Sequence, residues 1–137
     1  MSLYLCIFDG NEETAAVEVG GYADFDALRQ YIVTELEEGR AGSRFPTLVL
    51  HSDCDGVWSV DDCVRLRDEL AAIAAAMRLR PALPPSSTWQ REMAQQTGRK
   101  PRSALESFLD VDGEVLLEQL EGLVRAALAS GRPILFQ

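Results

Sequence analysis

The stretch from Arg44 to Cys63, RFPTLVLHSDCDGVWSVDDC, carries the strongest local signals for how this chain folds. Its apolar run from Thr47 to Leu50 predicts a buried strand, because β-branched and aliphatic residues follow one another without helical spacing. A polar turn over residues 52–56 ends that strand. Ser59, followed three residues later by Asp62, resembles a capping box at the start of a helix. The stretch therefore predicts a strand, an acidic turn and a helix N-terminus in one corner of the molecule.

Apolar patterns outside this corner predict the rest of the sheet. Residues 3–8, LYLCIF, are apolar on both faces, which predicts a strand in the middle of its sheet. After Asp9-Gly10, residues 14–19 are expected to return as the antiparallel partner in a hairpin that Gly20-Gly21 ends. Residues 134–136, ILF, are too apolar to trail in water, so they predict a final strand docked in the sheet.

Three segments with helical spacing of apolar residues are expected to cover the sheet. Asp24 is the predicted N-cap of the first helix, and Ser59 is that of the second helix. The third helix is expected over residues 112–131. Residues 88–93 predict a short additional helix. The three apolar stripes are Phe25, Leu28, Ile32 and Leu36; Cys63, Leu66, Leu70, Ile73 and Met77; and Leu116, Leu120, Leu123, Ala127 and Leu128.

These elements predict an α+β fold, a single-domain sandwich over residues 1–137. It has a mixed sheet of about four strands, including an N-terminal hairpin and a C-terminal strand, packed with three to four helices. A length of 137 residues suits one domain. No apolar run approaches the roughly 20 residues needed to cross a bilayer, so no membrane association is expected. An N-terminus without a basic segment, together with three unpaired cysteines, favours the cytoplasm.

The charge of the chain is negative and unevenly distributed. It has 22 acidic and 13 basic residues, a formal net charge of −9. Residues 1–38 hold nine acids and only Arg29, whereas residues 78–102 hold six basic residues and only Glu92. Because phosphate binding needs a basic surface, nucleic acid is not an expected partner. A basic protein suits this composition better, although acidity alone also serves solubility.

The loop from His51 to Asp62 is a candidate calcium site. Counted from His51, it places Asp53, Asp55, Gly56 and Asp62 at positions three, five, six and twelve, which parallels an acidic calcium-binding loop. However, His51 stands where the first carboxylate belongs, and Asp62 is shorter than the usual bidentate glutamate. Carboxylates near a helix N-terminus are also favoured without a metal. We therefore expect no metal site, and a metal-binding or regulatory module using this loop is the alternative function.

Cysteine and histidine side chains offer two further chemistries. A zinc site would need His51, Cys54 and Cys63, with Cys6 from a neighbouring strand. Thiol catalysis would pair Cys54 with His51, the only histidine, at a helix N-terminus that would favour the thiolate. No orienting third residue, glycine-rich phosphate loop or paired cysteine motif accompanies them. The sequence therefore predicts a protein that is not an enzyme and needs no cofactor.

Carboxylates and a tryptophan in the same stretch form a candidate recognition surface. The predicted partner-binding residues are Asp53, Asp55, Trp58, Asp61 and Asp62. Carboxylates beside an aromatic face suit the binding of lysine or arginine side chains. The structural alternative is that Trp58 packs against the helix it precedes, as a hydrophobic staple to Cys63.

Five segments are informative through their order along the chain. They are SLYLCIFDG at 2–10, GGYADFDALR at 20–29, GSRFPTLVLHSDCDGVWS at 42–59, FLDVDGEVLLEQL at 108–120 and GRPILFQ at 131–137. In this order they resemble the bacterial immunity proteins of polymorphic toxin systems, most nearly the family called immunity protein 70. The resemblance runs from Leu3 to Gln137. It implies a small cytoplasmic α+β protein that binds and neutralises a cognate toxin domain, and it brings no catalytic residues.

The leading hypothesis from the sequence is a toxin inhibitor that works by stoichiometric protein–protein contact. Exposed acids would speed its encounter with a basic partner, while one or two anchors would set the affinity. The basic residues Arg99, Lys100 and Arg102 argue against a purely electrostatic mechanism. A second acidic surface, the face of Glu114, Glu118 and Glu121, is the next candidate for contact. No motif identifies the toxin or the oligomeric state.

Overall fold

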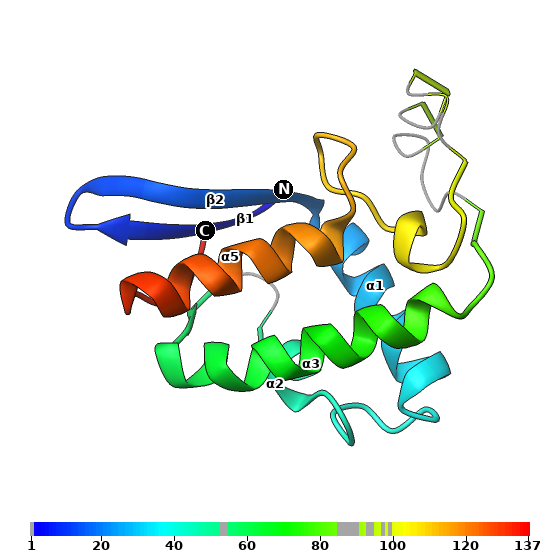
Figure 1. The fold of residues 1–137 in the computed structure, drawn as a ribbon, viewed down its shortest axis with the longest axis horizontal. Helices are drawn as coiled ribbons and strands as arrows, with labels where there is room; N and C mark the ends of the chain where they lie inside the picture. Colours follow the sequence, from blue (N-terminus) through cyan, green and yellow to red (C-terminus); the bar gives the residue numbers. More distant parts are fainter. Residues whose placement is uncertain (1, 53–54, 85–90, 93–94, 97, 99) are drawn as a thin grey trace.

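The computed structural model describes residues 2–52, 55–84, 91–92, 95–96, 98 and 100–137. A four-stranded sheet is packed with helices, so the predicted α+β class is confirmed. Figure 1 shows the long N-terminal hairpin in blue, with the helices to one side of it. In chain order the elements are β1 (Ser2–Asp9), β2 (Glu12–Gly21), α1 (Tyr22–Leu36), α2 (Pro46–Val49), β3 (Val57–Trp58), α3 (Val60–Arg78), the 3-10 helix η1 (Leu105–Ser107), α5 (Leu116–Ser130) and β4 (Ile134–Phe136).

The strands are arranged in the order β2-β1-β4-β3. The first strand is central, as predicted, because it pairs with β2 on one side and with β4 on the other. The chain returns at its C-terminus to place β4 between β1 and β3, which confirms the predicted terminal strand. All of these pairings are antiparallel, whereas the sequence predicted a mixed sheet.

Helices α1, α3 and α5 lie on one side of the β1–β2 hairpin (Figure 1). Leu3, Leu5 and Ile7, alternate residues of β1, point to this side and belong to the hydrophobic core. The predicted apolar stripes supply the helical half of that core. All of their members are buried except Leu128, which is half-buried and packed against it. Helices therefore cover one face of the sheet.

The first helix begins earlier than predicted. Gly21 is the N-cap of α1, and Asp24 lies three residues further on. There its carboxylate accepts a hydrogen bond from the N–H of Gly21 at 3.1 Å, so the side chain stabilises the helix start without being the cap residue. The helix ends at Leu36, before the predicted stop at Gly39, which has a φ of +79°.

The last helix begins at Leu116, four residues later than predicted. Asp110 holds the preceding residues in a turn, because its Oδ1 accepts hydrogen bonds from the backbone N–H groups of Asp112 (2.9 Å) and Glu114 (3.0 Å). The predicted C-terminal stop is confirmed: Gly131 caps α5 in a left-handed conformation, with a φ of 66°.

The strand predicted over residues 47–50 is wrong, because Pro46–Val49 is one helical turn, α2. Proline at the first helical position loses no hydrogen bond. The Glu69 carboxylate of α3 accepts hydrogen bonds from the free N–H groups of Thr47 (3.2 Å) and Leu48 (3.1 Å). A contact from another helix thus decides the conformation of an apolar run that is too short to specify it.

The last two predictions concern a short additional helix and the absence of membrane-spanning helices. Residues 91 and 92 are helical, but most of the short helix predicted over residues 88–93 lies outside the described residues. Among the described helices, none has both the length and the apolar composition that a bilayer crossing requires.

Candidate protein-binding site

The predicted acidic corner lies where β3 runs into α3. Ser59 is the N-cap of α3, and its Oγ accepts a hydrogen bond from the N–H of Asp62 at 3.0 Å. In return the Asp62 carboxylate accepts from the N–H of Ser59 at 3.0 Å. The capping box predicted from the spacing of these residues is confirmed, and it fixes the direction in which α3 leaves the sheet.

His51 ties the loop before β3 to the sheet. One ring nitrogen, Nε2, lies 2.9 Å from the carbonyl oxygen of Val57, and the other, Nδ1, lies 2.8 Å from that of Ser52. The ring stacks on Phe136 of β4 with centroids 4.2 Å apart and planes inclined by 24°. Arg29 of α1 donates to the His51 carbonyl oxygen. These contacts hold the loop against the C-terminal strand.

Trp58 is a buried residue of this corner, with 1% of its surface exposed. Its indole N–H donates to the carbonyl oxygen of Thr47 at 3.1 Å, and its ring meets Phe136 edge-on with centroids 4.7 Å apart. Trp58 directly precedes the N-cap, and Cys63, four residues into the helix, is buried in the same core. This packing agrees with the staple alternative and leaves Trp58 little surface to offer a partner.

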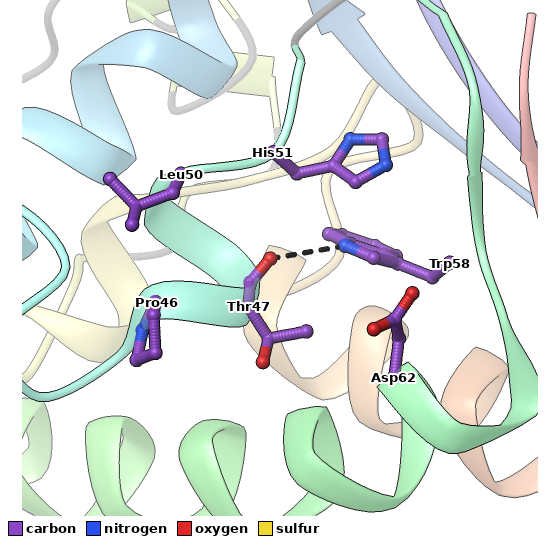
Figure 2. A pocket seen from close by; sticks show the side chains of 6 residues that line it. All are labelled: Pro46, Thr47, Leu50, His51, Trp58 and Asp62. Carbon is purple, nitrogen blue, oxygen red and sulfur yellow. Dashed lines mark hydrogen bonds between the residues drawn. The ribbon is translucent and has the colours of Figure 1, made fainter.

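A small cavity of about 210 Å³ opens beside Trp58. It is lined by Pro46, Thr47, Leu50, His51, Trp58 and Asp62. In Figure 2, Pro46 and Leu50 stand on one side of it, the rings of His51 and Trp58 on the other. Leu50 is 62% exposed, an unusual position for a large aliphatic side chain at the end of a helical turn. The cavity therefore combines an apolar wall with a carboxylate at its edge.

The five predicted contact residues fall into three groups. Asp53 lies outside the described residues. Asp55 and Asp61 are exposed, and no hydrogen bond or ion pair joins either of them to another described residue. Trp58 and Asp62 are instead parts of the helix start described above. Two of the five are thus charges open to solvent, and two support the corner from within.

Both carboxylate oxygens of Asp62 are engaged. One accepts from the N–H of Ser59, and the other pairs with the Arg65 guanidinium one helical turn away. Partial burial by itself would raise the pKa of Asp62, but the hydrogen bonds from Ser59 and Arg65 outweigh burial and lower it. Asp62 is therefore ionised, but the Arg65 cation beside it balances its charge. For this reason Asp62 adds little to the negative electrostatic potential of the corner.

The described part of the chain gives little support to a metal or thiol centre. It contains no group of three or more histidine, cysteine, aspartate or glutamate side chains placed to hold a metal ion. Both ring nitrogens of His51 already face carbonyl oxygens. Cys63 lies in the core, where burial and the nearby Asp62 raise its thiol pKa to about 11, and Cys6 is also fully buried, which raises the pKa of its thiol. Asp53, which the calcium hypothesis needs, and Cys54, which the zinc and thiol hypotheses need, lie outside the described residues.

The comparison with known protein families decides what kind of protein this is. The model of a family described as Immunity protein 70 matches residues 3–136, nearly the whole chain. The chain belongs to the immunity protein 70 family. No curated protein and no solved structure matches it. Membership implies an immunity protein whose partner is a protein toxin.

For a member of the immunity protein 70 family, the cavity adds a residue that sequence reasoning missed. Leu50 was assigned to a buried strand, and only the helical turn of α2 brings it to the surface. The signal that could have located it is Pro46, since proline favours the first position of a helix and so argues against a strand in the residues that follow.

Proposed function

We propose that this immunity protein binds and neutralises a cognate bacterial toxin domain, one inhibitor to one toxin, in the cytoplasm of the cell that carries both genes. It acts by contact and is not an enzyme. The observation that carries the proposal is the family match over residues 3–136. Asp55 and Asp61 are exposed in the loop and helix start that also supply His51 and Asp62 to the cavity, which adds a surface suited to a basic protein.

Asp55 and Asp61 are proposed to guide a basic toxin surface to the acidic corner, together with the predicted contact Asp53. Exposed carboxylates that are not neutralised by a neighbouring cation act over about a Debye length, roughly 8–10 Å at physiological salt. They raise the association rate more than they slow dissociation. The exposed Leu50 side chain is proposed to supply the apolar contact that the partner must desolvate.

Trp58 and Asp62 are proposed to act mainly as supports for this surface. The buried indole and the engaged carboxylate favour this division over direct contact by all five residues. A rigid corner needs little ordering when a partner binds, which preserves affinity.

The direct test is co-expression with the toxin domain encoded by the neighbouring gene. We expect the toxin domain alone to stop growth, and this protein to restore it while forming a one-to-one complex in size-exclusion chromatography with light scattering. A toxin domain that remains lethal and elutes separately from the inhibitor would refute the proposal.

The acidic corner is tested by Asp55→Asn combined with Asp61→Asn. The pair should slow association roughly threefold to tenfold and weaken its dependence on salt, with unchanged thermal stability. Glu114→Gln combined with Glu118→Gln is the matched control, because it removes the same charge from exposed side chains elsewhere. If the control slows association and the corner variant does not, the contact surface lies near α5.

A further inference from the structure

The face of the sheet that points away from the helices carries an apolar row across all four strands. Ala16 of β2 pairs with Cys6 of β1, Cys6 pairs with Leu135 of β4, and Leu135 pairs with Val57 of β3. Neighbouring strands lie about 4.8 Å apart, so this row spans roughly 14 Å. We call this side of the sheet the open face.

Aromatic side chains widen the row along β1. Tyr4 and Phe8 lie two residues to either side of Cys6 and therefore share its face. Neither belongs to the hydrophobic core or packs against it, and both are half-buried. Cys6, between them, is fully buried and offers a partner no surface of its own. The apolar surface of the open face therefore consists of the side chains around Cys6, which are half-buried (Tyr4, Phe8 and Leu135) or exposed (Ala16 and Val57).

This composition is unusual for a sheet face in water. Antiparallel sheets with one solvated face normally alternate apolar and polar residues, so that the outer positions are polar. On this chain the outer positions Tyr4, Cys6 and Phe8 of β1 and Leu135 of β4 are apolar or aromatic. Helices α1, α3 and α5 lie on the other side of the β1–β2 hairpin (Figure 1). Contiguous apolar surface of this kind on a soluble protein marks a binding site more often than a structural accident.

The charges around the open face are acidic. Glu18 and Glu13 pair with Tyr4 and Phe8 and share the open face. Asp9 and Glu12 pair with each other at the end of the hairpin and follow the alternation of the covered side. The four strands contain no lysine or arginine. Glu18 stands beside Tyr4, and Glu13 accepts a hydrogen bond from the Tyr4 hydroxyl at 2.7 Å. Only Asp9 has a cationic partner among the described residues, Arg132 at 2.8 Å. An apolar centre whose rim carries Glu13 and Glu18 along β2 fits a partner surface whose apolar centre is flanked by lysine or arginine.

We infer that the open face is the main docking surface for a basic toxin domain, an inference that rests on the proposed function above. The open face continues into the acidic corner, because Val57 ends the apolar row and its carbonyl oxygen faces His51. The toxin would contact both, with the corner guiding approach and the apolar row supplying the buried contact. A second copy of this chain is a poor occupant, since it would bring the glutamates of two rims together.

Four single substitutions to arginine test the inference, each adding the same charge. Ala16→Arg and Val57→Arg alter the two ends of the row. Ala72→Arg and Val64→Arg are matched controls on α3: Ala16 and Ala72 are both exposed, and Val57 and Val64 are 43% and 42% exposed. Glu18→Lys is a further variant on the open face that changes an already exposed side chain.

The measurement is the dissociation constant for the purified toxin domain encoded by the neighbouring gene, with the melting temperature of each variant. We expect Ala16→Arg and Val57→Arg to weaken binding by about 30-fold or more, with both controls within about threefold of the wild type. If Ala16→Arg does not fold, Glu18→Lys must weaken binding instead.

Three results would overturn the inference. Folded Ala16→Arg that binds as the wild type does would confine contact to the corner and leave the proposed function intact. A dimer of the free protein that Ala16→Arg dissociates would make a second copy the occupant. A wild-type protein that does not bind the toxin domain at all would refute the proposed function, and the inference with it.

Discussion

Ile134 and Leu135 are neighbours in β4, yet they face opposite sides of the sheet. Ile134 is completely buried in the core, opposite Trp58, whereas Leu135 lies in the apolar row of the open face. Both sides are apolar, but only one is covered by helices. The difference separates two roles that a hydrophobic pattern alone cannot distinguish: residues on the covered side hold the fold together, and those on the open side are available to a partner.

Acidic side chains also fall into two groups, buried and exposed. Glu37, 2% exposed, accepts hydrogen bonds from the backbone N–H groups of Gly42, Arg44 and Phe45 and so organises the loop after α1. Asp110, 4% exposed, holds the turn before α5. The glutamates of the open face remain exposed. These buried carboxylates thus organise turns of the fold, whereas the exposed ones are the acids we propose to act on association.

The most severe test of the covered side is deletion of residues 133–137. It removes β4, leaving β3 without its strand partner and exposing one edge of β1. We expect no soluble folded protein, because burial of each large apolar side chain contributes about 1.5–3 kcal/mol. Gln137→Ala, which retains the strand, should express and melt like the wild type. A truncated protein with the wild-type melting temperature would show that β4 is dispensable.

Trp58→Ala should cost about 3–5 kcal/mol in the free energy of unfolding, measured with urea, because it leaves a cavity in the core. Trp58→Phe loses the hydrogen bond to Thr47 but keeps an aromatic ring, so its cost should be smaller. If Trp58 is instead a contact residue, Trp58→Ala will raise the dissociation rate of the toxin complex without lowering stability. That outcome would reverse the division of roles within the acidic corner.

Ile134→Ala and Leu135→Ala compare the two faces at adjacent positions. Ile134→Ala should lower the free energy of unfolding by about 2–5 kcal/mol, whereas Leu135→Ala should lower it by less than about 1 kcal/mol. Toxin binding should respond in the opposite order once each variant is measured well below its melting temperature. Equal losses of stability would mean that the open face is covered in the folded protein.

The sequence predicted most of the fold because its long elements have clear periodicity. The hairpin, the buried stripes of α1, α3 and α5, and the terminal strand all follow from patterns of six or more residues or from an apolar end. The run from Thr47 to Leu50 was misassigned because four β-branched or aliphatic residues fit a strand or a helical turn equally well. The hydrogen bonds from Glu69 of α3 favour the helical turn, and Glu69 lies 19 residues beyond the end of the run. The strand β3 was missed because it has only two residues.

The site was less predictable than the fold, for a related reason. Spacing identified the capping box of Ser59 and Asp62, which depends on local contacts alone. It could not show that Trp58 points inward, because that depends on the register with Ile134, 76 residues away in the chain. The open face required the order of all four strands. Local sequence therefore located the start of α3, where the capping contacts lie within four residues, but it misplaced the starts of α1 and α5. Surfaces built by distant strands can be located only after the topology is known.

The smallest expected effect concerns Asp110, the buried acid in the turn before α5. Burial raises the pKa of this carboxyl despite hydrogen bonds from the backbone of Glu114 and Asp112, which lower it. Between the ordinary pKa of an unfolded aspartate and the raised folded value, the folded state binds more protons, so Asp110 makes stability fall as pH rises through that range. Above the folded pKa of Asp110, the buried carboxylate is fully ionised and its destabilising effect is at its maximum.

Asp110→Asn keeps an Oδ1 that can accept both hydrogen bonds and removes the charge. We expect the variant to melt at or slightly above the wild-type temperature at pH 7.5, and this advantage should disappear as the pH is lowered through the folded pKa of Asp110. Asp112→Asn, an exposed neighbour, should show no comparable change with pH in its difference from the wild type. If Asp110→Asn melts well below the wild type at pH 7.5, the negative charge of Asp110 itself stabilises the turn. That result would refute the expectation that the buried charge lowers stability at this position.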